Sequence, residues 1–418
     1  MFRFYELFNS QNNKTHNRRK NMRILIADDD FDVRLLLSRT VQKWGHEVLT
    51  AEDGAEALEL IKSENITFVI SDWMMPNMDG LELCRNIREL DEANSGYTYV
   101  ILLTAKESKT ELIQGMDAGA DDFVTKPFDK DVLKVRVRAG ERILELKENL
   151  DEKNKKLTAA LQTIEKDLVS AAKMQKGLLA PTPSTLSNVR FDSIYIQCSF
   201  VSGDIYNFFQ FDEDHIGFYL LDVAGHGIPS AMQSVTLSRA VNPLPEQTSL
   251  LKRYISELSK YEVVNPALAV SRLNEQFQAD EDTMLYFTMV YGIINTKTGL
   301  TKLTQAGHPS PIFVHNDGGV KFIGDGGFPV GMLPGVEFDE HELYLHKGDR
   351  LFLYSDGVTE CTGENNELFS EERLLQTLQE ERHSPLKDTL ATLEDSLRLW
   401  HNQPEFEDDV TLLAIEII

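Results

Sequence analysis

The stretch FVISDWMMPNMDG, residues 68–80, carries a short apolar run into Asp72 and then into a Met-Met-Pro turn. Similar apolar runs recur between residues 23 and 125, and amphipathic stretches separate them. Nearly continuous apolar strands that alternate with helices are typical of a parallel sheet covered on both faces. Residues 22–140 are therefore predicted to form an α/β doubly wound, flavodoxin-like domain with a parallel five-stranded sheet.

Polar side chains stand where these predicted strands end. The first strand ends in Asp28 and Asp29, the third in Asp72, the fourth in Thr104 and the fifth in Lys126. The carboxyl ends of parallel strands meet at one edge of a sheet, so these side chains should converge. Three carboxylates in one crevice repel each other unless a divalent cation lies between them, and hard oxygen ligands favour Mg²⁺. With Lys126 neutralising charge, such a site can make Asp72 a nucleophile toward a phosphoryl group.

Bulk composition limits the classes of partner. The chain has 418 residues, which suggests two or three domains, and its net charge of -25 disfavours binding to nucleic acid or anionic membranes. No apolar run approaches the ~20 residues that a membrane helix needs. Three scattered cysteines give no disulfide framework, which fits a reducing cytosol. We therefore expect a cytoplasmic protein with no nucleic-acid or membrane partner, and a disordered polar tail at residues 1–21.

Residues 141–180 have the composition of a long helix. An apolar residue recurs at heptad spacing from Ile143 to Leu178, and only Lys153 and Asp167 interrupt this seam. A narrow apolar seam on a long helix requires a partner helix. The segment is predicted to be a coiled-coil linker helix that forms a parallel homodimer. The alternative is a solvated connector without a partner.

Residues 181–418 change to β-prone runs separated by turns. Helical stretches are predicted between these runs at residues 229–241, 249–261, 266–279 and 370–400. Runs of strands with grouped helices indicate an α+β domain. We expect a two-sheet β-sandwich flanked by helices.

Acidic residues follow the apolar runs of this segment as well. They are Asp204, Asp222, Asp356, Asp408 and Asp409. Hard-oxygen ligands of this kind favour two Mn²⁺ or Mg²⁺ ions, with Asp204 and Asp222 as the expected bridges. A pair of ions lowers the pKa of a bridging water, so that hydroxide can attack phosphorus near neutral pH. The sequence therefore predicts a hydrolytic metal centre.

The first domain resembles the receiver domains of bacterial response regulators. The motifs that carry the resemblance are ILIADDD, VISDWMMPNMDG, ILLTA and DDFVTKPF. It implies that a histidine kinase or phosphotransfer protein phosphorylates Asp72. It also implies a Mg²⁺ site and a set of switch residues. The site comprises Asp28, Asp29, Asp72 and the Met74 carbonyl; the switch residues are Thr104, Phe123 and Lys126, with a cis peptide between Lys126 and Pro127.

Residues 171–418 are similar to the metal-dependent serine/threonine protein phosphatases of the type-2C superfamily, in the sporulation and stress-response branch. The motifs include AAKMQKGLLAP, DVAGHGIPSAM, GDRLFLYSDGVTE and DDVTLL. The resemblance implies a hydrolase whose substrate is a phosphorylated anti-sigma-factor antagonist. The implied metal ligands are Asp204, Asp222, the Val223 carbonyl, Asp356 and Asp408. Ser202 and Asn207 stand where the family usually has Gly and Asp.

Together these patterns predict a two-component response regulator whose phosphorylation at Asp72 controls a protein phosphatase in a partner-switching pathway. The catalytic residues expected are Asp204, Asp222, Asp356 and Asp408. The competing interpretation is a catalytically inert, phosphatase-like adaptor that sequesters a sigma-factor regulator. The intact set of aspartates argues against it, because a docking domain has no need of adjacent repelling charges. His226 and His308, each beside a glycine, are secondary candidates for proton donors.

Overall fold

The computed structural model describes residues 21–105, 109–225, 227–243, 249–255, 260–279, 285–364 and 366–418. The chain divides into two compact units, residues 1–160 and 161–418. The predicted tail at residues 1–21 lies outside the described residues except for Asn21. Within the described ranges, no helix combines the length and the apolarity that a membrane span requires.

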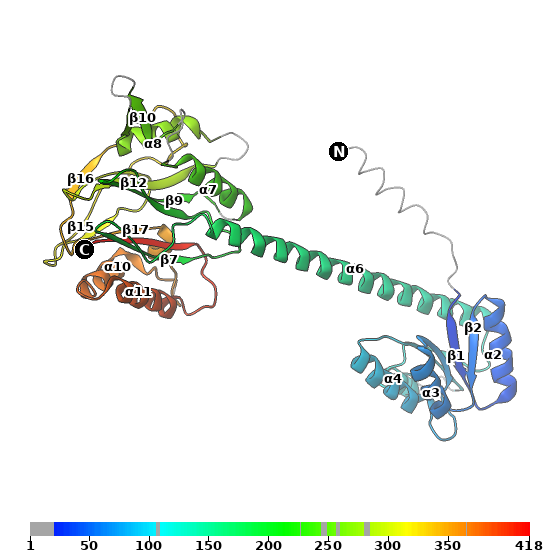
Figure 1. Cartoon of the computed structure of the whole chain (residues 1–418). Helices are drawn as coiled ribbons and strands as arrows, with labels where there is room; N and C mark the ends of the chain where they lie inside the picture. The colour runs from blue at the N-terminus through cyan, green and yellow to red at the C-terminus, as the bar shows by residue number, and fades with distance from the viewer. Residues whose placement is uncertain are drawn as a thin grey trace. The chain divides into compact units, whose positions relative to one another are not determined.

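The first unit is built on a sheet of five parallel strands in the order β2-β1-β3-β4-β5 (Figure 1). The strands are β1 (Arg23–Ala27), β2 (Glu47–Ala51), β3 (Phe68–Asp72), β4 (Tyr99–Thr104) and β5 (Asp122–Thr125). The helices are α2 (Phe31–Lys43), α3 (Gly54–Glu64), α4 (Gly80–Asn94), α5 (Lys109–Asp117) and the start of α6 (Lys130–Lys176). Each face of the sheet carries its own apolar core. The predicted doubly wound fold is confirmed.

Three aspartates fix where the helices of this unit begin. Asp30, Asp53 and Asp79 are the N-cap residues of α2, α3 and α4, and each side chain accepts a hydrogen bond from a backbone N–H of the first turn. A cap of this kind stabilises a helix by about 1 kcal/mol. The caps set the ends of the loops that follow β1, β2 and β3, which are the loops at the carboxyl edge of the sheet.

The helix α6 is a single element of 47 residues. Leu133 and Val137 on its first turns are buried against the sheet of the first unit. The predicted linker is thus the continuation of the last helix of the first domain and not a separate element. Its apolar seam is exposed along much of its length, with Leu146 at 60% and Leu157 at 59%. The helix is confirmed, and its pairing with a second helix stays a prediction.

Among the described residues, the second unit contains two large antiparallel sheets and one two-stranded hairpin. The five-stranded sheet has the order β16-β13-β12-β9-β8, formed by β8 (Ile205–Gln210), β9 (His215–Val223), β12 (Phe287–Asn295), β13 (Leu300–Ala306) and β16 (His341–Tyr344). The six-stranded sheet has the order β15-β14-β17-β18-β7-β6, formed by β6 (Ser184–Leu186), β7 (Val189–Ile196), β14 (Ile312–Val314), β15 (Val320–Phe322), β17 (Arg350–Tyr354) and β18 (Val410–Ile417).

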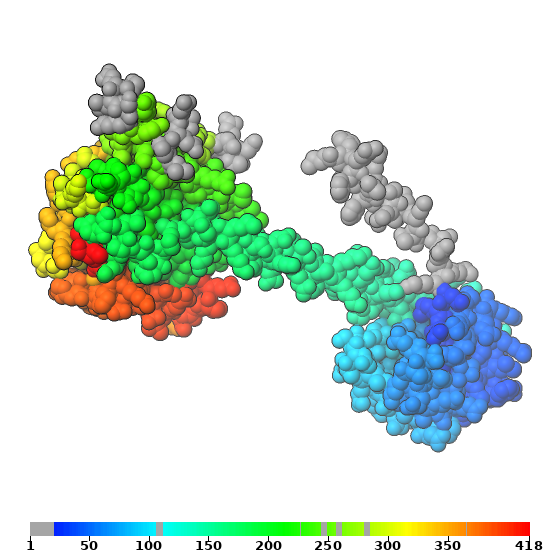
Figure 2. Space-filling model, viewed as in Figure 1, coloured from blue at the N-terminus to red at the C-terminus, as the bar shows by residue number. Residues whose placement is uncertain are grey.

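The two sheets pack face to face, and helices cover both outer faces. Phe191 of β7 stacks on Phe208 of β8 within the core between the sheets, with ring centroids 4.0 Å apart. Helices α7 (Ile228–Ala240) and α8 (Pro266–Gln276) cover the five-stranded sheet, and α10 (Ser370–Glu380) and α11 (Leu386–His401) cover the six-stranded sheet. Figure 2 shows α10 and α11, in orange to red, at the surface of this unit. The predicted sandwich flanked by helices is confirmed.

One predicted helix is wrong. Residues 249–261 contain part of an antiparallel hairpin of β10 (Lys252–Ile255) and β11 (Lys260–Val263). Tyr254 lies opposite Tyr261 with ring centroids 5.1 Å apart, and Arg253 pairs with Glu262 across the strands at 2.8 Å. Cross-strand pairs of these kinds stabilise a hairpin and outweigh a weak helical preference. The predicted helix at 370–400 is divided into α10 and α11, and Pro385 is the residue before α11.

Candidate functional site

Three carboxylates gather at the carboxyl edge of the parallel sheet. Asp28 and Asp29 follow β1 and Asp72 ends β3, and each offers an oxygen within 4.8 Å of the others. Asp28 is fully buried and Asp72 is half-buried. The Lys126 Nζ atom lies 2.8 Å from Asp28 Oδ2 and 2.9 Å from Asp72 Oδ1. The predicted set therefore converges, and its oxygens suit Mg²⁺.

Burial and the neighbouring charges shift the pKa values of Asp72 and Lys126 in this crevice. Burial raises the pKa of Asp72, and the hydrogen bond from Lys126 only partly offsets it. Burial acts against the charge of Lys126, but its hydrogen bonds to Asp28 and Asp72 raise its pKa on balance. Among the described residues, Lys126 is the cation that pairs with these carboxylates, and it contacts Asp28 and Asp72. A divalent cation fits the remaining negative charge.

The other residues predicted for this site surround the acidic cluster. Thr104 is buried at the end of β4, and its carbonyl accepts a hydrogen bond of 2.7 Å from the Lys126 N–H. Phe123 on β5 is half-buried against the core. The Met74 side chain is 70% exposed, and the peptide between Lys126 and Pro127 is cis.

The carboxylates of the second unit come from both sheets. Ile205 of β8 lies opposite Leu221 of β9, so that Asp204 and Asp222 are neighbours at the end of this strand pair. Asp356 begins α9 (Asp356–Thr359), two residues after β17 ends. Asp408 precedes β18, which pairs with β17. A Cβ atom on Gly357 would lie 2.1 Å from the Asp409 carbonyl oxygen, so glycine is required where α9 meets the segment that carries Asp408.

The charges of these side chains act on one another. Burial and the negative charges of Asp356 and Asp408 raise the pKa of Asp222 to about 7. Burial and the charges of Asp222 and Asp409 raise the pKa of Asp204 well above its usual range. Burial and the charge of Asp408 also raise the pKa of Asp356. The four predicted catalytic aspartates therefore form one electrostatic cluster.

This cluster fits divalent cations on two further observations. Asp204 is 1% exposed, and its Oδ2 atom has no hydrogen-bond partner among the described residues. A buried oxygen without a partner is costly unless a metal or a donor occupies the space before it. A Cβ atom on Gly203 would lie 3.0 Å from the Val223 carbonyl oxygen and 3.4 Å from Asp222 Oδ1. Glycine thus leaves room beside two of the predicted ligands.

Asp409 differs from the other predicted metal residues because hydrogen bonds occupy both of its oxygens. Its Oδ1 accepts from the Cys198 N–H at 2.9 Å, and its Oδ2 accepts from Ser202 Oγ at 2.6 Å and the Gly203 N–H at 3.0 Å. These contacts suit Asp409 to holding the loop before Asp204. Burial and the nearby Asp409 carboxylate raise the pKa of Cys198 to about 12. Cys198, Asp408 and Asp409 each offer a ligand atom, and these atoms lie within 4.8 Å of one another.

Sequence reasoning did not single out Gln175, which joins α6 to this loop. Gln175 is 3% exposed; its Nε2 donates to the Ser202 carbonyl at 2.6 Å and to Ser234 Oγ at 3.0 Å. Its Oε1 accepts from the Ser202 N–H at 3.0 Å. Ser202 Oγ also accepts from the Asp204 N–H at 3.0 Å. The side-chain amide of Gln175, on the last turn of α6, therefore holds the backbone of Ser202 in the loop that leads to Asp204. The sequence feature that could have indicated this role is a glutamine next to the apolar residues at the end of an otherwise exposed helix.

Of the two histidines proposed as proton donors, the structure describes His308. His226 lies outside the described residues. His308 is 2% exposed; its Nδ1 contacts Thr288 Oγ1 at 2.8 Å, and Thr288 lies opposite Asp222 in the sheet. Burial lowers the pKa of His308 to about 3. The ring is neutral near pH 7, so it suits packing between strands and does not suit proton donation.

Acid should destabilise the second unit through His308. The pKa of His308 is about 3 in the folded protein and 6.5 in the unfolded chain. The contribution of neutral His308 to stability is therefore complete above pH 6.5 and is lost as the pH falls toward 3, because only the unfolded chain binds the proton in this range. At about pH 4 the loss is roughly 3 kcal/mol. We expect His308→Gln to flatten the pH dependence of the free energy of unfolding, measured by urea denaturation. The exposed His346 provides the control, and an equal flattening in His346→Gln would contradict the assignment.

Comparison with known proteins adds two family matches. Residues 24–138 match the response regulator receiver domain, and residues 212–418 match stage II sporulation protein E (SpoIIE). A "Response regulator MprA" of Mycolicibacterium vanbaalenii is 44% identical over 118 residues, which is 28% of this chain and 49% of that protein. The MprA of Mycobacterium avium is 43% identical over 118 residues, 28% of this chain and 50% of that protein. The chain spans about half the length of the curated relatives that it matches.

A solved structure resembles the second unit. The SiaA-PP2C domain of Pseudomonas aeruginosa aligns with 62% of this chain and 99% of that domain, with a TM-score of 0.52 and 18% sequence identity. At this identity the likeness shows a common fold.

Proposed function

The chain belongs to the response regulators and carries a receiver domain followed by a SpoIIE-type phosphatase domain, and from this premise we propose that phosphorylation of Asp72 controls a metal-dependent phosphoserine and phosphothreonine protein phosphatase. The phosphodonor proposed is a histidine kinase or phosphotransfer protein. The substrate proposed is a phosphorylated anti-sigma-factor antagonist, on the resemblance to the sporulation and stress-response branch.

The proposal of phosphatase activity rests on the cluster of four aspartates, in which Asp204 Oδ2 has no hydrogen-bond partner among the described residues. Burial and the negative charges of neighbouring aspartates, Asp408 among them, raise the pKa values of Asp204, Asp222 and Asp356. Such carboxylates are stable together when divalent cations compensate their charge. Asp204, Asp222, Asp356 and Asp408, with the Val223 carbonyl, would hold two Mn²⁺ or Mg²⁺ ions. When bound, such ions supply a hydroxide nucleophile near neutral pH and neutralise charge on phosphoryl oxygens.

The protein's own residues would position this chemistry. Asp204 directly precedes β8 and Asp222 lies near the end of the neighbouring strand β9, so the sheet holds their oxygens in place before substrate arrives. Asp409 and Ser202 fix the loop that carries Asp204. Preorganised ligands stabilise developing charge without a cost of reorganisation at the moment of reaction.

Control by the receiver would pass along α6. The helix begins against the receiver sheet and ends with Gln175 on the Ser202 loop. Moving a two-state switch from 1:99 to 99:1 takes about 5.5 kcal/mol. A phosphoryl group on Asp72 can form a few charge-assisted hydrogen bonds, each contributing roughly 1.5–3 kcal/mol. One modification is therefore sufficient in energy to reposition α6 and the loop.

Hydrolysis of p-nitrophenyl phosphate by the full chain tests whether the second unit is an enzyme. We expect turnover that depends on added Mn²⁺ and that stops when EDTA is added. The competing proposal is an inert adaptor, which would bind a sigma-factor regulator without turnover. Absence of Mn²⁺-dependent hydrolysis of this compound and of a phosphoserine peptide would favour the adaptor.

The exposed seam of α6 should make the protein a parallel dimer. Leu157→Asp places a charge on this seam, where leucine burial contributes about 1.5–3 kcal/mol per helix. The dimer Kd should rise by about a hundredfold or more, measured by sedimentation velocity. Gln162→Asp, exposed and off the seam, adds the same charge and should leave the dimer intact. A wild-type chain that sediments as a monomer at all concentrations would exclude the dimer.

A further inference from the structure

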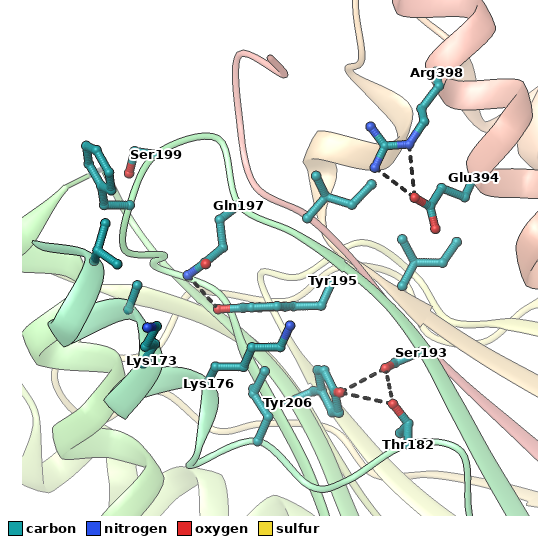
Figure 3. A pocket seen from close by; sticks show the side chains of 16 residues that line it. Lys173, Lys176, Thr182, Ser193, Tyr195, Gln197, Ser199, Tyr206, Glu394 and Arg398 are labelled. Atoms are coloured by element: carbon teal, nitrogen blue, oxygen red, sulfur yellow. Dashed lines mark hydrogen bonds and ion pairs between the residues drawn. The ribbon is translucent and has the colours of Figure 1, made fainter. Parts of the chain in front are cut away.

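A hollow of about 770 Å³ lies in the second unit between the end of α6, strand β7 and helix α11. We call it the α6–β7 hollow. None of its lining residues belongs to either predicted metal site. Its volume lies within the roughly 300–1,000 Å³ of small-molecule sites. Figure 3 shows Lys173 and Lys176 on one side, Tyr195 across the middle, and Glu394 with Arg398 on the other side.

The charged lining of this hollow is positive, although the chain has a net charge of -25. Arg398 donates two hydrogen bonds to Glu394 Oε1, at 3.0 and 2.8 Å, so these two charges compensate each other. Lys173 and Lys176 are exposed, and no carboxylate of the described residues pairs with either of them. Two uncompensated ammonium groups therefore line one cavity, and an anion would gain there from both.

Hydroxyl groups provide further donors in the hollow. Thr182 Oγ1 lies 2.7 Å from Ser193 Oγ, which lies 2.8 Å from the Tyr206 hydroxyl. Hydroxyl hydrogens rotate, so this chain of three can turn one O–H toward a ligand. Phosphoryl oxygens accept several such bonds at once and form strong charge-assisted bonds with lysine. The donor set thus matches a phosphoryl group.

The remaining lining is apolar and includes an exposed aromatic ring. Phe200 is 42% exposed and Val169 is 38% exposed. Every nucleobase has a face that can stack on an aromatic side chain. We propose that the α6–β7 hollow binds a phosphorylated small molecule of the nucleotide class, with its phosphate at Lys173 and Lys176 and its ring against Phe200.

A partner helix on the α6 seam would leave this hollow open. At 3.6 residues per turn, Lys173 and Lys176 lie about 100–160° around α6 from the seam positions Ala171 and Met174. The site is therefore compatible with the proposed dimer.

An occupant of the hollow would lie beside the contacts that position Asp204. Lys173 and Lys176 flank Gln175, which holds the Ser202 backbone. The Tyr195 hydroxyl, in the middle of the hollow, donates to the Asp204 carbonyl at 3.4 Å. Ligand binding can therefore alter how α6 holds the loop. The effect on turnover rests on the proposed phosphatase, whereas the binding itself does not.

Binding is tested by isothermal titration calorimetry of the full chain in EDTA, which removes divalent ions that would themselves bind phosphate. The probes are ATP and inorganic phosphate. We expect ATP to bind, with a Kd that rises about tenfold or more in Lys173→Ala/Lys176→Ala. The pair Lys155→Ala/Lys166→Ala removes the same charge from exposed positions of α6 outside the hollow and should bind as the wild type does. Phe200→Ala should weaken ATP and leave inorganic phosphate unchanged.

Each result of these titrations either supports or overturns the proposed nucleotide site. The proposal is supported if ATP binds more tightly than inorganic phosphate and if this binding is lost in Lys173→Ala/Lys176→Ala but kept in Lys155→Ala/Lys166→Ala. Equal binding of the two probes overturns the ring contact and assigns a site for free phosphate. No binding of either probe, or equal weakening in both lysine pairs, overturns the site. Thermal unfolding of each variant separates a local change from a loss of fold.

Discussion

Replacing Asp222 with Asn should abolish metal-dependent hydrolysis by the second unit. The substitution removes one negative charge and keeps the size of a side chain that lies beside Asp204 and feels the charges of Asp356 and Asp408. Loss of a metal ligand removes several kcal/mol of transition-state stabilisation, and each roughly 1.4 kcal/mol is a factor of ten. We expect kcat with p-nitrophenyl phosphate to fall by about a thousandfold at saturating Mn²⁺.

A matched variant separates this effect from a general change in charge. Asp395 is exposed on α11, and Asp395→Asn should retain wild-type turnover. The fold should survive in Asp222→Asn, because removing one of several repelling carboxylates relieves the metal-free site. Full turnover in Asp222→Asn would remove this residue from the catalytic set.

Replacing Asp72 with Ala should disconnect the phosphatase from its signal. In the wild type we expect acetyl phosphate and Mg²⁺ to phosphorylate Asp72 and to change turnover by about 5- to 150-fold, the usual range of coupling between two sites. The variant should incorporate no phosphoryl group and keep one constant rate. Phosphate incorporation and phosphopeptide turnover, measured on the same samples, provide the two readouts.

The control for this experiment is another acidic residue of the same domain. Asp117 is exposed at the end of α5, and Asp117→Ala should respond to acetyl phosphate as the wild type does. Equal turnover of Asp72→Ala and of the phosphorylated wild type, in both dimer and monomer, would exclude control through Asp72.

The parts of the fold that sequence predicted are those with strong local patterns. The strands of the first unit are nearly continuous apolar runs that end in polar residues, and that pattern predicted that Asp28, Asp72 and Lys126 lie close together. In the second unit, the β-prone sequence LTKLTQA forms strand β13. The hairpin of β10 and β11 was missed because its stability comes from pairs between strands, which a helical window does not reveal.

The contacts that organise the second site come from distant parts of the sequence. Asp409 and Ser202 are 207 residues apart, and Gln175 and Ser202 are 27 apart. Asp409 was predicted among the metal residues because it follows Asp408, and the two offer oxygens within 4.8 Å of each other. The hydrogen bonds of Asp409 to the loop before Asp204 come from packing, which sequence spacing does not reveal.

The proposed phosphatase activity requires the aspartate cluster of the second unit to bind divalent ions. Equilibrium dialysis against Mn²⁺, followed by measurement of bound metal, tests it on the full chain. We predict that the wild type binds two more ions per chain than Asp204→Asn/Asp222→Asn, while the receiver contributes equally to both. An equal number of bound Mn²⁺ ions per chain in the wild type and in the double variant would contradict metal binding by the aspartate cluster.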